Sequence, residues 1–295
     1  MKKFLLYTVK LISIVIILMY GLDLIYSHTF KNGIPRNKIQ KILQTKNVHY
    51  NMVFLGSSRT ENHIDCELVE QLTGKSCINF GLSGGTIGDM LILLTLADSN
   101  GLTFDDVFLQ VDYNFNSKGL SNNFKASLIP FIKNRDIRQE LKKDTENFYY
   151  NYIPFYRYMK YDKVVGFRES LLAFIKKKPK TNLEVGFNPK SGIGLTQSGK
   201  LPLNYNQKNE EIESIVKLIQ AKDANINFFT APYCKDMKNR NQFNVLKSRL
   251  DNISNYSAIF DNNEAYFFNC GHLNIEGARA FTKILIKDFY TLKAN

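Results

Sequence analysis

Five short apolar runs alternate with amphipathic stretches along this 295-residue chain, and this rhythm restricts the fold more than any other feature. The runs are Met52–Leu55, Cys77–Phe80, Val107–Tyr113, Ile226–Ala231 and Ala265–Phe268. Such runs suit the strands of a parallel sheet that is covered on both faces. Helical patterns occupy Thr86–Ala97, Glu210–Ala221, Gln242–Leu250 and Ile275–Tyr290. The alternation predicts an open, doubly wound α/β sheet with right-handed crossovers.

Polar segments stand where three of these strands end. They are Gly56–Thr60, Asn79–Thr86 and Val111–Asn114, and a fourth segment, Gly271–Asn274, comes just before the last helix. Ligand sites of doubly wound sheets gather at the carboxyl edge of the strands. We therefore expect the four segments to meet at one edge of the sheet.

A serine at a strand exit and a distant histidine are the parts that nucleophilic acyl chemistry needs, because the histidine takes the hydroxyl proton. Ser58 is the candidate nucleophile, with Ser57 as the near alternative. His272 is the candidate base, because it alone of the four histidines precedes a helix with an asparagine cap, Asn274. A plain turn serine and a helix-start histidine without chemistry are the simpler interpretations.

The order of these segments resembles the SGNH (GDSL-like) hydrolase superfamily over residues 50–116 and 225–295. Within it, the chain is most similar to membrane-anchored members that act on cell-envelope polymers, such as alginate acetylation and teichoic-acid D-alanylation proteins. The resemblance implies a three-layer, flavodoxin-like parallel sheet with Ser58 as nucleophile and His272 as base. It also implies an oxyanion hole made by Ser58, Gly84 and the side-chain amide of Asn114.

Two positions depart from the family pattern. Asn269 stands three residues before the histidine, where the family has an aspartate, and Phe115 replaces the acid that follows Asn114. An asparagine carbonyl accepts from histidine Nδ1–H but does not offset the imidazolium charge. In serine proteases an Asp-to-Asn change costs about 10⁴ in turnover. The chain therefore works as a Ser-His dyad steered by Asn269, uses another acid such as Asp261, or has lost catalysis.

Two neighbouring residues carry weaker predictions. Arg59, next to the nucleophile, either holds an anionic group of the substrate or is a solvated residue at the start of a helix. His63 falls within a helical pattern and is expected at the surface.

The N-terminal sequence predicts a membrane anchor. A mostly apolar stretch runs from Phe4 to Tyr26, and twenty-three helical residues are long enough to cross a bilayer core of about 30 Å. No small-x-small cleavage site follows, which favours an uncleaved signal anchor over a secretory peptide. We expect a cytoplasmic tip and anchor over residues 1–26, a basic stalk over 27–49, and a domain over 50–295 with an insertion at 115–206.

Two features of the sequence indicate on which side of the membrane the domain lies: the charges that flank the apolar stretch, and the cysteines. Basic residues after the apolar stretch favour the inside, but long domains translocate largely regardless of charge, and the family resemblance favours the outside of the cytoplasmic membrane. The four cysteines allow two disulfides in three pairings, or four buried thiols. Cys234 and Cys270 would meet near the site if both flanking strands end at the same edge.

The middle of the chain has its own composition. Eight aromatic residues fall between Phe148 and Tyr161, with lysines and arginines around them. They stack on sugar rings, lie at a membrane interface, or pack as amphipathic helices on the edge of the domain.

The function expected from all of this is acyl transfer or ester hydrolysis on a cell-envelope polysaccharide, by a single-pass membrane protein. The competing hypothesis is a catalytically impaired subunit that binds glycan or a membrane partner. The net charge of +12 fits an anionic neighbour, acidic lipid or acidic glycan, while the absence of a nucleic-acid motif disfavours nucleic acid. We expect no metal or cofactor, and an integral membrane acyltransferase is the conceivable protein partner.

Overall fold

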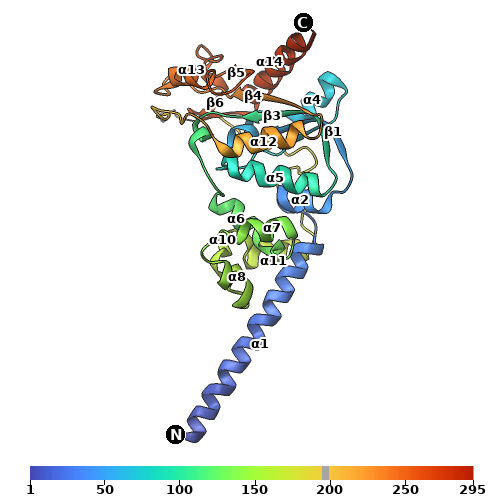
Figure 1. Ribbon diagram of the computed structural model, residues 1–295, viewed down its shortest axis with the longest axis vertical. Helices are drawn as coiled ribbons and strands as arrows, with labels where there is room; N and C mark the ends of the chain where they lie inside the picture. Colours follow the sequence, from blue (N-terminus) through green and yellow to red (C-terminus); the bar gives the residue numbers. More distant parts are fainter. Residues whose placement is uncertain (195–198, 295) are drawn as a thin grey trace. The chain divides into compact units, whose positions relative to one another are not determined.

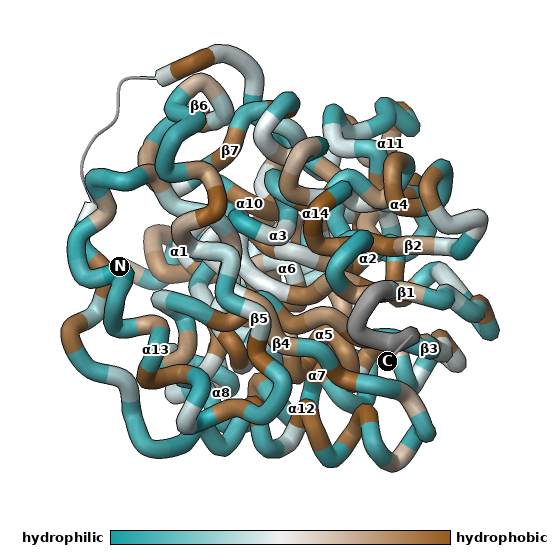
Figure 2. The backbone as a smooth tube through the Cα atoms, turned by 90° about the horizontal axis from the view of Figure 1, so that it is seen from above, coloured by the Kyte–Doolittle hydropathy of each residue, from teal (hydrophilic) through white to brown (hydrophobic). Residues whose placement is uncertain are grey.

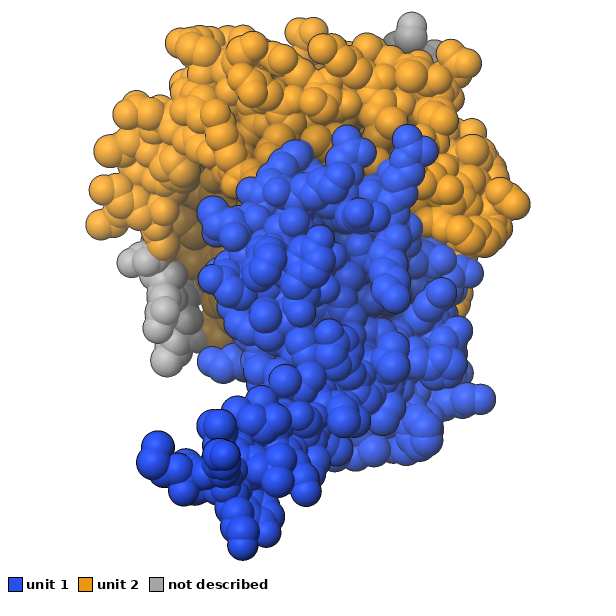
Figure 3. All heavy atoms as spheres, turned by 60° about the horizontal axis from the view of Figure 1, so that its bottom comes forward, with its two compact units in different colours: residues 1–44, 122–179 blue, residues 45–121, 180–295 orange. Residues whose placement is uncertain are grey.

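The structure is a computed structural model that describes residues 1–194 and 199–294. The chain forms two compact units, coloured blue and orange in Figure 3. Unit 1 comprises Met1–Gln44 and Asn122–Pro179, and unit 2 comprises Thr45–Ser121 and Lys180–Asn295. The helical part of the expected insertion thus belongs to the same unit as the N-terminal helix. Residues 195–198 of that insertion lie outside the described residues.

Unit 1 is helical. Its first helix, α1, covers Lys2–Asn32 and is the one helix of the described chain that is long and apolar enough to cross a membrane. The other helices are α2 (Lys38–Gln44), α6 (Asn122–Leu128), α7 (Arg135–Leu141), α8 (Asn147–Tyr152), α9 (Tyr156–Lys160), α10 (Asp162–Val165) and α11 (Phe167–Phe174), with a 3₁₀ turn at Ile129–Phe131. A small core of Tyr26, Phe30, Tyr158 and Val165 joins α1 to this bundle.

Unit 2 is built on a five-stranded parallel sheet (Figure 1). Its strands are β1 (His49–Leu55), β2 (Cys77–Asn79), β3 (Thr103–Gln110), β4 (Asn225–Thr230) and β5 (Ile253–Asn255). They stand in the order β2-β1-β3-β4-β5, the order of flavodoxin-like sheets. The predicted α/β class and four of the five predicted strands are confirmed.

The fifth predicted strand is wrong. Residues Glu264–Tyr266 form a 3₁₀ turn, and β6 (Phe267–Asn269) pairs antiparallel with β7 (His272–Leu273) in a separate two-stranded sheet. The Asn269 side chain accepts a hydrogen bond from the Gly271 N–H, and this turn reverses the chain after three residues. The edge position in the main sheet is taken by β5, which is too short and too polar to stand out as an apolar run.

Helices cover both faces of the sheet. One face carries α3 (Ser58–His63), α4 (Cys66–Thr73) and α14 (Ile275–Ala294), and the other carries α5 (Ile87–Ser99) and α12 (Glu210–Gln220). Phe54, Phe108 and Phe229 of the strands pack against Phe281 and Leu285 of α14 in the main core. The α5 helix is apolar on nearly all sides, as its brown tube shows in Figure 2, and most of its residues are buried where it packs beside α12.

The remaining helix predictions hold unevenly. The helix expected at Gln242–Leu250 is shorter: a 3₁₀ turn at Arg240–Gln242 leads into α13, which covers only Phe243–Leu246. A further 3₁₀ helix, Tyr113–Asn116, follows β3.

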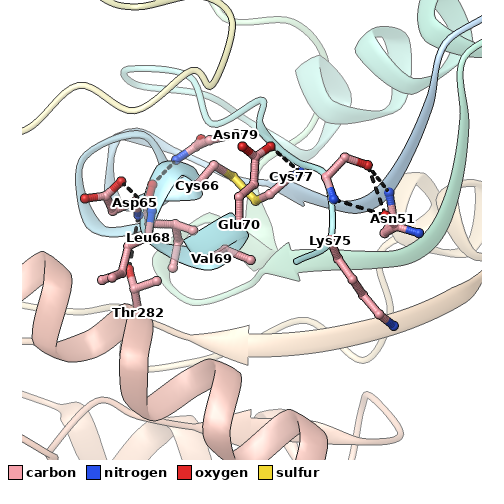
Figure 4. Close-up of a disulfide and its surroundings, with 12 residues drawn as sticks. Asn51, Asp65, Cys66, Leu68, Val69, Glu70, Lys75, Cys77, Asn79 and Thr282 are labelled. Atoms are coloured by element: carbon pink, nitrogen blue, oxygen red, sulfur yellow. Dashed lines mark hydrogen bonds between the residues drawn. A yellow bond between two sulfur atoms is a disulfide. The ribbon is translucent and has the colours of Figure 1, made fainter. Parts of the chain in front are cut away.

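All four cysteines are paired. Cys66 bonds to Cys77, which ties α4 to β2, and Cys234 bonds to Cys270 beside β6. Figure 4 shows the first bridge next to Asp65, whose carboxylate caps α4 by accepting from the Leu68 N–H. Of the three pairings that the sequence allowed, the structure selects Cys66–Cys77 with Cys234–Cys270.

Candidate active site

A glycine sets the exit from β1. Gly56 has a φ of +152°, and a Cβ there would lie 2.2 Å from Thr60 Oγ1 and 2.7 Å from the Gln110 side chain. Only glycine fits this position, since any side chain would collide and favour another backbone conformation. The chain can therefore leave the strand and start α3 at once, which puts Ser58 at the first position of that helix.

The two adjacent serines have different environments. Ser57 is fully buried; its hydroxyl donates to Gln110 Oε1 (2.9 Å) and accepts from the Arg59 N–H (3.3 Å) as the cap of α3. Ser58 is half-buried, and its Oγ lies 2.9 Å from His272 Nε2. The structure thus brings Ser58, and not Ser57, to the histidine, although 214 residues separate the pair in sequence.

His272 is held by the turn that precedes it. Its Nδ1 lies 3.1 Å from Asn269 Oδ1, and the Gly271 N–H donates to the same oxygen at 3.0 Å. Because a backbone N–H can only donate, the amide must keep its oxygen on this side. His272 Nδ1 must then carry the proton, so that the Nε2 lone pair faces Ser58. This is the tautomer that a general base requires.

The charge state of His272 follows from its surroundings. Burial, with smaller contributions from Arg59 and Lys190, lowers the pKa of His272 from its usual 6.5 to about 4. The imidazole is therefore neutral at ordinary pH and ready to accept a proton. With Asn269 in place of a carboxylate, none of the described groups that shift this pKa is an anion.

His63 is not at the surface, contrary to expectation. It is fully buried in α3, and its Nε2 accepts from the Leu273 N–H at 3.0 Å. Its ring stands edge-on to that of His272, with centroids 6.0 Å apart. Burial, Arg59 and His272 together hold the pKa of His63 well below 6.5. His63 is thus a neutral acceptor that fixes β7 against α3.

The expected oxyanion donors lie in different places. As the first residue of α3, Ser58 has an N–H that the helix ladder does not use. Asn114 is turned inward: its Oδ1 accepts from the Asp112 N–H and its Nδ2 donates to the Gln110 carbonyl. Gly84 is an exposed turn residue with a φ of +69°. Neither Gly84 nor Asn114 is among the described residues that line the cavity beside Ser58.

The second segment instead braces the nucleophile. Asn79 is buried; its amide donates to the carbonyls of Thr60 and Ile64, and its Oδ1 accepts from the Gly81 N–H. The Leu82 N–H donates to the Gly56 carbonyl. These bonds attach the segment after β2 to both ends of the β1–α3 connection.

Arg59 is buried rather than solvated. Its Nε lies 3.1 Å from Asp112 Oδ2, and its Nη2 donates to the carbonyls of Ala231 and Pro232. The guanidinium also stacks on the Tyr233 ring, 3.1 Å from the centroid. Arg59 therefore joins α3 to the ends of β3 and β4, while one edge of it lines the cavity.

A cavity of about 630 Å³ opens beside Ser58 and His272. Its walls are mainly apolar and aromatic: Ser58, Arg59, Tyr113, Gly199, Lys200, Leu201, Pro202, Leu203, Tyr233, Met237, Gly271 and His272. Tyr113 follows Asp112 in the third polar segment and could have been found there. The 199–203 loop and Met237 carry no pattern in sequence, because tertiary folding alone brings them to the site.

The acids considered as substitutes do not reach the histidine. Asp261 binds Arg240, with Oδ2 3.0 Å from Nη2. Phe115, where the family has an acid, is a buried core residue. The partner of His272 Nδ1 in the structure is the Asn269 amide.

Comparison with protein-family models and with curated proteins finds no match. Among solved structures, one described as "The structure of a putative platelet activating factor from Streptococcus pneumonia" is similar, with 15% identity and a TM-score of 0.41. The match covers 96% of this chain and 98% of that one.

Proposed function

We propose that this chain is an SGNH-type enzyme, anchored in the cytoplasmic membrane by α1, that transfers or hydrolyses acyl esters on a cell-envelope polysaccharide. The observation that carries the proposal is the 2.9 Å contact between Ser58 Oγ and His272 Nε2 at the mouth of a cavity. The Asn269–Gly271 turn supports it, because it fixes the histidine in the tautomer that can take the serine proton.

The chemistry follows from these positions. Ser58 Oγ attacks the ester carbonyl while its proton passes to His272 Nε2. The same proton then goes to the departing alcohol, which leaves an acyl group on Ser58. Attack by water on that acyl-serine gives hydrolysis, and attack by a sugar hydroxyl gives transfer. The Ser58 N–H, free of the helix ladder, is the donor placed to stabilise the developing oxyanion.

The residues that line the cavity and the net charge of the chain indicate the class of substrate. Tyr113 offers an exposed aromatic ring of the kind on which sugar rings stack, and Lys200 lines the same cavity. The chain's net charge of +12 fits an acidic polymer. An extracytoplasmic location is supported by the two disulfides of unit 2, since disulfides persist in oxidising compartments.

A second candidate is a non-catalytic subunit of envelope assembly that binds glycan or a membrane partner. Two observations favour it: Asn269 supplies no charge to offset an imidazolium, and the Asn114 amide is engaged within its own loop. This alternative keeps the cavity but predicts no acyl-enzyme.

The two are separated by trapping the acyl-enzyme. The full-length chain in detergent micelles is incubated with p-nitrophenyl acetate and examined by mass spectrometry after rapid acid quenching. The enzyme proposal expects a burst of p-nitrophenol with an acetyl group on Ser58. If p-nitrophenol is released no faster than in buffer and Ser58 stays unmodified, the enzyme proposal is wrong and the non-catalytic binding subunit is the remaining candidate. Adding a soluble acidic glycan then distinguishes transfer from hydrolysis by the product formed.

A further inference from the structure

An aromatic surface in unit 1 has no part in the site described above. Helix α8 and the residue after it expose Phe148, Tyr149, Tyr152 and Ile153, which we call the aromatic platform. Tyr152 is 68% exposed and Phe148 59%, and their rings lie 5.0 Å apart. Large contiguous aromatic residues on a surface mark an interaction site, since single exposed apolar residues are common but clusters are not.

The position of the platform along α1 follows from three anchoring contacts. Asp23 of α1 accepts from Arg157 Nη2 at 2.6 Å through Oδ1, and from the Phe155 N–H at 3.0 Å through Oδ2. Tyr26, one turn further, packs edge-on against Phe155 with centroids 4.9 Å apart. The turn between α8 and α9 is therefore fixed at the level of Asp23 on α1.

That level coincides with the edge of a bilayer. From Phe4 to Asp23 is nineteen helical steps of about 1.5 Å, or about 29 Å, which matches a hydrocarbon core of about 30 Å. The large apolar residues of this stretch are exposed, whereas the helix becomes packed from Tyr26 onward. A carboxylate at the boundary is expensive unless paired, and Asp23 has its pair in Arg157.

We propose that the aromatic platform lies in the headgroup region of the same membrane that α1 crosses, as a second attachment of unit 1 to the lipid. Figure 1 shows α8 on the side of the helical bundle that faces the N-terminal half of α1. Tyrosine is enriched at this depth because its ring is apolar while its hydroxyl stays hydrated, and phenylalanine is common on the apolar face of interfacial helices.

Charge near the platform fits the same occupant. Lys142 and Lys143 are exposed just ahead of α8, and basic residues close to a membrane are attracted to anionic headgroups. Tyr150 and Tyr158 are the tyrosines of this region that pack in the interior of unit 1, because both are buried. The exposed rings of the platform take no part in that core. The inference rests on α1 crossing the bilayer and is independent of the proposed chemistry.

The test uses the absence of tryptophan from the chain. Full-length Tyr152→Trp, with Phe148→Trp as a second reporter, is reconstituted in vesicles of phosphatidylcholine and phosphatidylglycerol. Each variant keeps an aromatic ring on an exposed position, so the fold is not challenged. Quenching by lipids that carry a shallow doxyl group is then compared with quenching by aqueous acrylamide.

The matched control is Phe174→Trp, on an equally exposed phenylalanine of α11. The carbonyl of Ala173, the residue before Phe174, lies against Gly33. Gly33 follows Asp23 by ten residues, which corresponds to about 15 Å along the helix axis, away from the bilayer. We expect a blue-shifted emission at position 152 and lipid quenching several-fold stronger than at position 174, with acrylamide showing the reverse order.

Three outcomes would overturn the proposal. Equal lipid quenching at positions 152 and 174 means that the platform has no special depth. Strong acrylamide quenching at position 152 means that the face stays in water and awaits a protein partner. Protection from both quenchers means that a second copy of the chain covers it.

Discussion

Asn269 Oδ1 lies 3.1 Å from His272 Nδ1, and the Gly271 N–H holds that oxygen in place. In serine proteases an asparagine at the acid position is damaging mainly because it stabilises the wrong histidine tautomer. Here the shared oxygen leaves only one tautomer compatible with both hydrogen bonds. What the site lacks is the negative charge, and the two effects can be tested separately.

Ser58→Ala should abolish acyl transfer to the protein and lower the rate of p-nitrophenyl acetate turnover by about 10³-fold or more, because Ser58 supplies the hydroxyl that His272 Nε2 contacts within the described residues. The matched control is Ser57→Ala. It removes a helix cap, which costs about 1 kcal/mol in the free energy of unfolding, but should keep most of the rate. Rates are measured with both variants in the same detergent. If Ser57→Ala loses the turnover rate and Ser58→Ala keeps it, Ser57 is the nucleophile instead of Ser58.

Asn269→Asp should raise the rate and shift its pH dependence. In the wild type, His272 becomes neutral as pH rises through its pKa of about 4, so the rate should already be near its plateau at pH 5 to 6. A carboxylate beside Nδ1 favours the imidazolium and should raise that pKa by about one to three units. The acid limb of kcat against pH should move upward with it. Asn269→Ala, which frees the tautomer without adding charge, should lower the plateau and leave no such upward shift.

Stability should fall on mild acidification because of the buried histidines. The pKa of His63 is below 6.5 in the folded state, so the unfolded chain takes up the proton first. The free energy of unfolding is therefore highest above pH 6.5 and falls as pH drops below it, by up to about 1.4 kcal/mol per pH unit for this group. His272 acts in the same direction down to about pH 4.

Replacement of His63 tests this origin. His63→Gln keeps an acceptor for the Leu273 N–H and should flatten the pH slope by about one proton. His63→Ala leaves that N–H unpaired, which should lower the free energy of unfolding by a further amount of about 1–3 kcal/mol at every pH, the cost of an unsatisfied buried donor. Chemical denaturation between pH 5 and 8 measures both effects. A slope unchanged in both variants would assign the acid sensitivity to other groups.

The two disulfides should differ in their effect on activity. Each should contribute about 2–4 kcal/mol to stability, with the longer Cys234–Cys270 loop of 36 residues at the upper end. Cys270 lies between Asn269 and Gly271, so Cys270→Ala should also disturb the turn that orients His272. Cys77→Ala is the matched control, because its loop of 11 residues does not include this turn. We expect kcat to fall more in Cys270→Ala at equal loss of stability, measured below both unfolding transitions.

The sequence determined the α/β layers, the long apolar N-terminal helix and the pairing partners Ser58 and His272. Apolar runs and polar strand exits are local signals, and parallel strands bring their carboxyl ends to one edge. The misplacement of the fifth strand had a local cause as well. Ile253–Asn255 carries no apolar run, whereas Phe267 and Phe268 do, although they belong to a hairpin.

Only the tertiary structure decided how the site is completed. Burial of His63, the inward turn of the Asn114 amide and the Arg59–Asp112 pair depend on which elements meet, and no local pattern encodes that. The same holds for the aromatic residues of 148–161, some of which fill the core of unit 1 while others remain exposed. A sequence gives the chemical type of each side chain, but its burial and its partner are set by contacts between residues far apart in the chain, which form only when the whole chain folds.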